Sequence, residues 1–284
     1  MTTTAVPAVP ARVRAVPPVS RRPGLPGALR SELIKIRSVR STYWTLLAQA
    51  LASIAWAALF CAGTVSHWAT ESPQDQAQFN AAHASLMGQV ALGELIIVVL
   101  GALVITSEYS TGMIRTSLAV MPRRGVLYAA KAIVFEGVTL TISLITSFVA
   151  FFVGQAILAS KHINTTLAQP GVLRAVLLSA AVVTVFGLFA YGTGALIRHT
   201  AGAITTILGV IFLIPVLAQA LPSSWYQDIV RWLPGGQALS PIASSAPPLA
   251  SDHLFSAWGQ FAVFSGYAVI LLALGAWSFI RRDA

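Results

Sequence analysis

Six long apolar segments, separated by shorter polar ones, dominate the hydrophobic pattern of this chain. They lie at residues 43–65, 86–106, 132–158, 173–197, 202–221 and 258–280. Crossing about 30 Å of hydrocarbon takes roughly 20 helical residues, so each segment is long enough to span a membrane. The fifth is the least regular, because Gly209 and Pro215 predict a broken or partly re-entrant helix there. The pattern predicts an all-α, polytopic membrane protein with six transmembrane helices.

A different periodicity precedes the first span, at residues 28–42. Apolar side chains recur there at helical spacing, namely Leu29, Leu33, Ile36 and Val39. Charged side chains occupy the positions between them, including Glu32, Lys35, Arg37 and Arg40. We predict an amphipathic helix lying in the inner membrane interface, with a solvated juxtamembrane turn as the alternative. Residues 1–27 are rich in Pro and Arg without a helical period, which predicts a disordered cytoplasmic tail before a membrane domain at 28–284.

The composition agrees with a membrane chain and excludes several soluble classes. Hydrophobic residues make up 56% of the 284 positions and charged residues only 10%, whereas soluble domains average roughly 25% charged residues. The net charge of +9 does not indicate nucleic-acid binding, because the basic residues border the apolar segments instead of forming one soluble face. Cys61 is the only cysteine and the His residues are scattered, so we expect neither an intrachain disulfide nor a metal site.

The distribution of basic residues predicts the orientation in the membrane. If both termini are cytoplasmic, all 18 Lys and Arg residues except Lys161, Arg174 and Arg231 lie on the cytoplasmic side. Cytoplasmic loops are enriched in Lys and Arg, which strongly favours this arrangement. We predict a multi-pass protein of the plasma membrane, surrounded by the lipid bilayer, with both termini in the cytoplasm.

The cytoplasmic loop at residues 107–131 has the most ordered arrangement of charge and turn residues. Gly112 interrupts the helix that ends the second span, and an apolar stripe follows up to Pro122, which predicts a short helix along the inner surface. The charged residues expected to face a cytoplasmic partner are Glu108, Arg115, Arg123, Arg124 and Lys131. A plain positive-inside loop explains the arginines but not this order of residues.

The external loop at 222–257 carries a second short helical pattern. Trp225, Ile229, Trp232 and Leu233 are spaced as on one helix face, and Pro234 ends the pattern. We predict a short helix at the outer headgroups, where Trp and Tyr concentrate. It is either an aromatic anchor or a lid over a substrate path.

Two acidic residues fall within the predicted spans. Glu94 lies in the second span and Glu136 near the inner end of the third. A carboxylate in hydrocarbon costs roughly 2.5–3.5 kcal/mol on insertion scales, so Glu94 needs a partner, an aqueous cavity or a proton. It is therefore either a functional intramembrane site or a protonated side chain hydrogen-bonded to a neighbouring helix. For Glu136 we expect snorkelling to the inner surface or pairing with Lys131 or another basic group, with a role in transport as the alternative.

Motifs of enzymes are missing from the sequence. It contains no GxxxxGK[ST] loop for ATP, no HExxH and no GxSxG. We therefore expect no catalytic residue and no cofactor in this chain. Any uphill transport takes its energy from another subunit or from an ion gradient.

Taken together, several segments make the chain resemble the membrane subunits of ABC-2 type ABC transporters, particularly actinobacterial ones. The segments are SELIKIRSVRSTYWTLL (31–47), EYSTGMIRTSLAVMPRR (108–124), IRHTAGA (197–203), RWLPGGQA (231–238) and RRDA (281–284). Each is a loose pattern, whereas their order across six spans is specific.

The resemblance implies a permease without its own ATPase. A separate subunit would bind ATP and Mg²⁺ and dock on the N-terminal interfacial helix and on the loop at 107–131. By position, the resemblance implies that the coupling element in this loop includes Glu108, Gly112, Arg115, Pro122, Arg123, Arg124 and Lys131. A second permease subunit, as a homodimer, would complete the transport path. Most such families export their substrates.

Two alternatives remain at this point. An ion-coupled secondary transporter would use Glu94 to bind protons, although no internal repeat is evident. A non-transporting membrane scaffold would leave the ordered loop unexplained.

Overall fold

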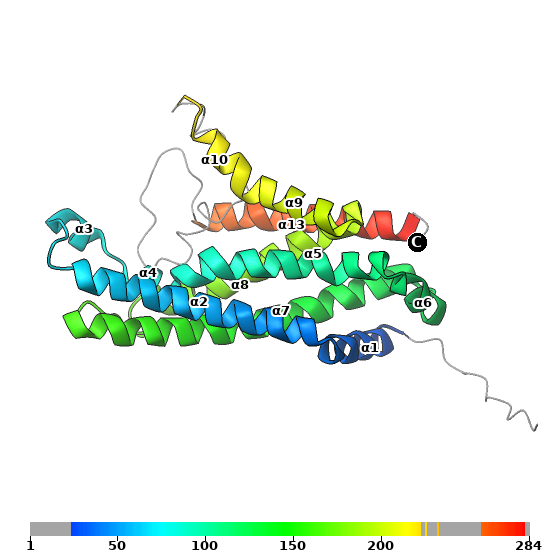
Figure 1. The fold of residues 1–284 in the computed structure, drawn as a ribbon, viewed down its shortest axis with the longest axis horizontal. Helices are drawn as coiled ribbons and strands as arrows, with labels where there is room; N and C mark the ends of the chain where they lie inside the picture. The colour runs from blue at the N-terminus through cyan, green and yellow to red at the C-terminus, as the bar shows by residue number, and fades with distance from the viewer. Residues whose placement is uncertain (1–23, 223–224, 226–231, 233–256, 282–284) are drawn as a thin grey trace, which may run out of the picture.

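The structure is a computed structural model, and the residues that it describes are 24–222, 225, 232 and 257–281. Among these residues, six helical segments are long and apolar enough to cross a membrane. They are α2 (Arg40–His67), α4–η1–α5 (Ala81–Ser110), α7–η2 (Arg124–Lys161), α8 (Val172–Ile197), α9–η3–α10 (Thr200–Ala218) and α13 (Ala257–Arg281). The predicted all-α fold with six spans is confirmed, and Figure 1 shows the long helices running side by side.

Several spans extend beyond the predicted bounds. The third begins at Arg124 instead of near residue 132, and the first begins at Arg40 instead of near residue 43. Apolar runs mark only the part of a helix that lies in hydrocarbon, whereas the helix itself continues into polar residues at its ends. At the end of the bundle that carries the C-terminus, these helices are therefore longer than predicted (Figure 1).

Helix α8 lies at the centre of the bundle and packs against α5 (Glu94–Ser110), α7 (Arg124–Leu158) and α13. Its side chains Val183, Phe186 and Tyr191 are fully buried. Gly192 lets α13 approach closely, since a Cβ there would lie 2.7 Å from the backbone carbon of Leu271. Small residues at such contacts are typical of helix packing in membranes.

Two spans contain a π-helical turn. The second has η1 (Gln89–Gly93) between α4 (Ala81–Gly88) and α5. The fifth has η3 (Gly209–Leu213) between α9 (Thr200–Leu208) and α10 (Ile214–Ala218), so it stays helical past Gly209. The irregularity expected around Gly209 and Pro215 thus takes the form of one π-helical turn.

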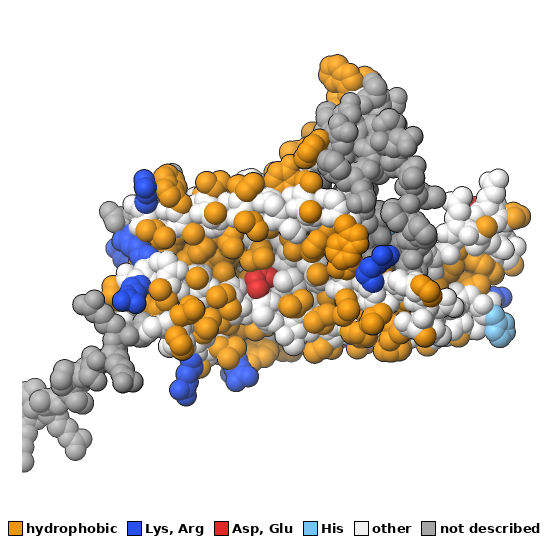
Figure 2. Space-filling model, turned by 180° about the vertical axis from the view of Figure 1, so that it is seen from behind, with side chains coloured by type: hydrophobic (Ala, Val, Ile, Leu, Met, Phe, Trp, Pro, Cys, Tyr) orange, Lys and Arg blue, Asp and Glu red, His pale blue; other side chains and the backbone are white. Residues whose placement is uncertain are grey.

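Short helices mark the two ends of the bundle. Helix α1 (Leu25–Ser38) and helix α6 (Met113–Val120) lie at the end where the C-terminus is found, and α3 (Pro73–Gln78) lies at the opposite end (Figure 1). Figure 2 shows apolar side chains over the middle of one face and basic side chains gathered at the end that bears α1 and α6.

The amphipathic helix predicted at 28–42 is present as α1, which ends at Ser38 before an extended Val39. The predicted tail falls largely outside the described residues. So does the predicted external helix, of which only Trp225 and Trp232 are described, and both side chains are exposed.

Candidate functional site

The loop between the second and third spans forms a compact turn–helix–turn. Gly112 has a positive φ of 71°, a conformation that favours glycine, and it turns the chain sharply after α5. Helix α6 follows and ends at Val120, and Met121 caps it directly before Pro122, which lacks a backbone donor and stops the helix. Buried Ile114 and Met121 hold α6 against the bundle. The predicted short helix is present.

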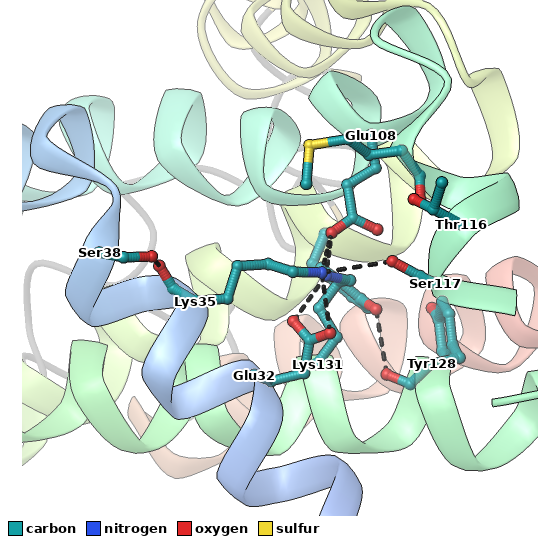
Figure 3. A network of polar contacts seen from close by, with 10 residues as sticks. Glu32, Lys35, Ser38, Glu108, Thr116, Ser117, Tyr128 and Lys131 are labelled. Carbon is teal, nitrogen blue, oxygen red and sulfur yellow. Dashed lines mark hydrogen bonds and ion pairs between the residues drawn. The ribbon is translucent and has the colours of Figure 1, made fainter. Parts of the chain in front are cut away.

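Four charged side chains meet beneath this loop, as Figure 3 shows. They form the charge cluster, which consists of Glu32 and Lys35 from α1, Glu108 from α5 and Lys131 from α7. The Lys131 ammonium donates to Glu32 Oε2 and to Glu108 Oε1, both at 2.7 Å. The Lys35 ammonium donates to Glu108 Oε1 at 2.6 Å and to Glu32 Oε1 at 3.1 Å. Each ammonium thus bridges both carboxylates.

A fifth side chain adds helix α6 to the same cluster. Ser117 of α6 accepts a hydrogen bond from Lys35 Nζ at 3.5 Å. The cluster therefore connects α1, α5, α6 and α7, which are elements from widely separated parts of the sequence. Nothing in the sequence pattern marks Ser117, because a serine on a short surface helix is unremarkable without its partner.

The cluster is shielded from solvent and balanced in charge. Lys131 is 2% exposed, Glu32 is 3% exposed and Glu108 is 5% exposed, while Lys35 is partly exposed. Two ammonium groups offset two carboxylates, which avoids a net buried charge. Removing one partner from such a buried set typically costs about 3–5 kcal/mol, because an uncompensated charge remains.

Lys35 shows the electrostatic balance of the cluster. Burial alone would lower the pKa of its ammonium, but the hydrogen bond and charge of Glu108 and the charge of Glu32 outweigh it and raise the pKa above its ordinary value of 10.5. The ammonium form is therefore favoured by the fold across the physiological range.

The position of Lys35 differs from the sequence expectation. The apolar pattern placed it on the polar side of the N-terminal helix, whereas it points into the bundle together with Glu32 and the buried Ala28. The apolar residues Leu33, Ile34 and Val39 are exposed instead. The packed face of α1 was missed because two of its members are charged, and only the i, i+3 spacing of Glu32 and Lys35 signals that they pair.

The remaining predicted loop and helix residues lie outside the cluster. Pro122 is exposed, and so are the arginines Arg37, Arg40, Arg115 and Arg123. Arg124 is partly exposed and its Nη1 donates to the carbonyl oxygen of Ile280 at 3.4 Å. The predicted set therefore divides into a buried charge cluster and an exposed basic surface at the same end of the bundle.

The two intramembrane acids do not join the cluster. Glu94 is 3% exposed, and its Oε2 is buried without a hydrogen-bond partner in the described part of the chain. Glu136 is partly exposed, and neither of its carboxylate oxygens has a hydrogen-bond partner there. The expected pairing of Glu136 with Lys131 is wrong, because the Lys131 ammonium points toward Glu32 and Glu108.

Within the part of the chain that the structure describes, no group of three or more His, Cys, Asp or Glu side chains is arranged to hold a metal ion.

Comparison with known proteins agrees with this arrangement. No curated protein matches the sequence. The sequence profile described as "ABC-2 family transporter protein" matches residues 28–216, which is more than half of the 284-residue chain. The match includes α1, the loop with α6 and the first five spans. The chain therefore belongs to the ABC-2 transporter family, as a membrane permease subunit of an ABC transporter.

Proposed function

We propose that the chain is the membrane half of an ATP-driven exporter, and that α1, α6 and the charge cluster couple it to a separate ATP-binding subunit. ATP and Mg²⁺ bind in that partner. The observation that carries the proposal is the convergence of α1, α5, α6 and α7 on one buried set of charges. A push on α6 or α1 reaches two transmembrane helices directly through this set.

The sixth span has its own connections to the loop region. Arg124, at the start of α7, donates to the carbonyl oxygen of Ile280. Arg198, at the end of α8, donates from Nη2 to the carbonyl oxygen of Ser278 at 2.8 Å, and its guanidinium lies 5.0 Å from the ring centre of Tyr109. Arginines at the C-terminal end of a helix also complement its dipole. The ends of α5, α7, α8 and α13 are therefore linked at the level of the loop.

Coupling requires a difference in contact energy between two arrangements of the spans. Closure of the ATP-binding partner shifts the permease only to the extent that the partner binds one arrangement better than the other. Because the buried charges must stay paired, they move as a unit with the helices that carry them. The cluster thus makes α1, α6 and the inner ends of α5 and α7 one rigid body.

The charge distribution supports the proposed orientation of the protein in the membrane. The basic residues Arg37, Arg40, Arg115 and Arg123 are exposed at the end that carries α1 and α6. Positive residues concentrate on the cytoplasmic side, so this end faces the cytoplasm and both termini lie there. The exposed arginines then meet the ATP-binding subunit. A second copy of the chain completes the transport path as a homodimer in the plasma membrane.

The test is capture of the ATP-binding subunit from native membranes by the tagged protein. The variant R115E/R123E reverses two exposed charges of the loop without touching the charge cluster. Because like charges facing across an interface cost several kcal/mol, we expect the captured ATP-binding subunit to fall about tenfold. K161E/R174E is the matched control, since Lys161 and Arg174 are exposed at the opposite end of the bundle. Equal capture by both variants would refute the docking role of the loop.

A further inference from the structure

Glu136 is a carboxylic acid in the third span that has no hydrogen-bond partner among the described residues. It lies twelve residues after Arg124, the first residue of α7, which corresponds to about 18 Å along the helix. Both of its carboxylate oxygens are buried without a hydrogen-bond partner, while the side chain as a whole is partly exposed. A group of this kind inside a membrane marks a functional site by default.

No basic residue of the described spans is placed to neutralise it. In these helices Lys131 is already bound to two carboxylates. The other Lys and Arg residues of the described spans lie at the helix ends, at positions 40, 124, 161, 174 and 281. A second copy related by an axis normal to the membrane presents the same residues at the same depths. The described spans of a homodimer therefore offer Glu136 no cation either.

The Glu136 carboxylate lies beside Gly187 of α8. A Cβ at Gly187 of α8 would lie 3.1 Å from Glu136 Oε1 and 3.2 Å from side-chain carbons of Ile97 and Phe135, so the carboxylate occupies space that a larger residue would fill. On the outer side, a Cβ at Gly137 would meet no atom within 4 Å.

The face around this position is apolar as well. The side chains of Ile133 and Leu140, on either side of Glu136 along α7, are exposed. Figure 2 shows many apolar side chains over the middle of one face of the bundle. Among the described residues of the spans, Glu136 is the acidic residue that is partly exposed.

These features select the kind of cation that fits. A metal ion such as Ca²⁺ takes roughly six to eight oxygen ligands, whereas the space beside Gly187 is lined by Glu136 Oε1 together with side-chain carbons of Ile97 and Phe135. An organic cation with a large apolar body fits this site better. Its positive charge pairs with the Glu136 carboxylate, and its apolar body packs against the apolar side chains around it. A carboxylate also discriminates strongly against uncharged molecules of the same shape.

We propose that Glu136 is the recognition site for a lipophilic organic cation, which enters from the membrane at the face formed by α7 beside α8. That this cation is the exported cargo rests on the proposed function, whereas its binding does not. The Glu136 side chain rotates its carboxylate from Gly187 toward the exposed face, and the cation replaces the missing partner there.

Binding of tetraphenylphosphonium to the full chain in lipid nanodiscs tests the inference. Equilibrium dialysis against empty nanodiscs corrects for partition into lipid, and triphenylphosphine oxide serves as the uncharged probe. We expect E136Q to weaken phosphonium binding at least about tenfold, equivalent to about 1.4 kcal/mol, and to leave binding of the uncharged probe unchanged. E136D keeps the charge and is expected to retain most of the affinity.

E94Q is the matched control, because it makes the same chemical change on the neighbouring helix α5 at a side chain that is enclosed and does not reach the face. Equal phosphonium affinity in the wild type, E136Q and E94Q would overturn the inference. If E136Q does not fold, labelling of wild-type Glu136 by a hydrophobic carbodiimide replaces it as the assay. Protection of Glu136 by the phosphonium supports the site, and unprotected labelling or no labelling contradicts it.

The result of the cation-binding test can be distinguished from the result of the capture test for the proposed function. Capture of the ATP-binding subunit by E136Q is expected to equal that of the wild type, because Glu136 lies outside the loop and the charge cluster. Lost cation binding with intact capture supports both proposals. Intact cation binding in E136Q with intact capture overturns only the recognition site.

Discussion

The charge cluster and the two intramembrane acids solve the same physical problem in opposite ways. In the cluster, Glu32 and Glu108 are deeply buried but each accepts hydrogen bonds from both Lys35 and Lys131. Glu94 and Glu136 are held within spans, yet carboxylate oxygens of both have no hydrogen-bond partner among the residues that the structure describes. Within the described residues, the same bundle therefore contains two carboxylates that are paired with ammonium groups and two that are not.

The difference separates architecture from function. Paired buried charges fix the relative positions of four elements, and removing one member of such a set strongly lowers the stability of the fold. Unpaired carboxylates contribute nothing to that architecture, so their persistence in a span requires a ligand, a proton or another external partner. The two regions should thus respond differently to the same kind of substitution.

The largest effect is expected from K131M. This change removes the most buried ammonium and leaves Glu32 and Glu108 to share Lys35 alone, which we expect to cost about 3 kcal/mol. Thermal unfolding in detergent measures it through the buried thiol of Cys61, the only cysteine of the chain, which reacts with a fluorogenic maleimide when the bundle opens. K161M, at an exposed lysine, is the control and should unfold like the wild type. If K131M also unfolds like the wild type, the cluster does not hold the bundle together.

A smaller effect is expected when both members of one ion pair are removed. In E108L/K131M, Glu32 and Lys35 remain as a simple pair, and no carboxylate is left without an ammonium. Buried ion pairs are often replaced by apolar residues at little cost, so the double variant should be more stable than the sum of the single changes by about 1–3 kcal/mol. The same Cys61 assay on the two single variants completes the cycle. Additive losses would show that the two side chains act independently.

Much of the fold follows from the sequence, because membrane burial acts on long runs of residues. Runs of about 20 apolar residues define the spans, and Gly112 and Pro122 delimit α6 through backbone conformations that they favour or forbid. These signals are local, so no knowledge of the tertiary structure is needed to interpret them.

The charge cluster could be predicted only in part. Glu108 and Lys131 stand out within the loop sequence, but Lys35 does not, since a lysine on an amphipathic helix normally faces water. Its inward position depends on where α1 docks against α7, which is a tertiary property. For the same reason, the pairing expected between Glu136 and Lys131 failed: Lys131 has better partners from distant parts of the chain.

The pH dependence of stability gives a smaller test of the cluster. Because the folded state raises the pKa of Lys35 above its ordinary value of 10.5, the protonated ammonium stabilises the fold, and this contribution is fully present below pH 10.5. It is lost as the pH rises from there through the pKa of the folded state. We therefore expect the unfolding temperature of the wild type to fall above pH 10.5 more steeply than that of K35M. Parallel pH profiles of the two proteins would contradict a paired Lys35.

The smallest effect on stability is expected from E94Q, which makes the comparison sharpest. Glu94 is as buried as Glu32, but its Oε2 has no hydrogen-bond partner and the side chain belongs to no ion pair among the described residues. Replacing the carboxyl by an amide of the same shape removes no pairing and no longer requires a charge or a proton inside the span. The unfolding temperature should therefore be unchanged or slightly raised, whereas E32Q, the same substitution in the cluster, should lower it clearly. Equal losses in E94Q and E32Q would mean that the two carboxylates differ only in the polar partners around them and not in what they contribute to the fold.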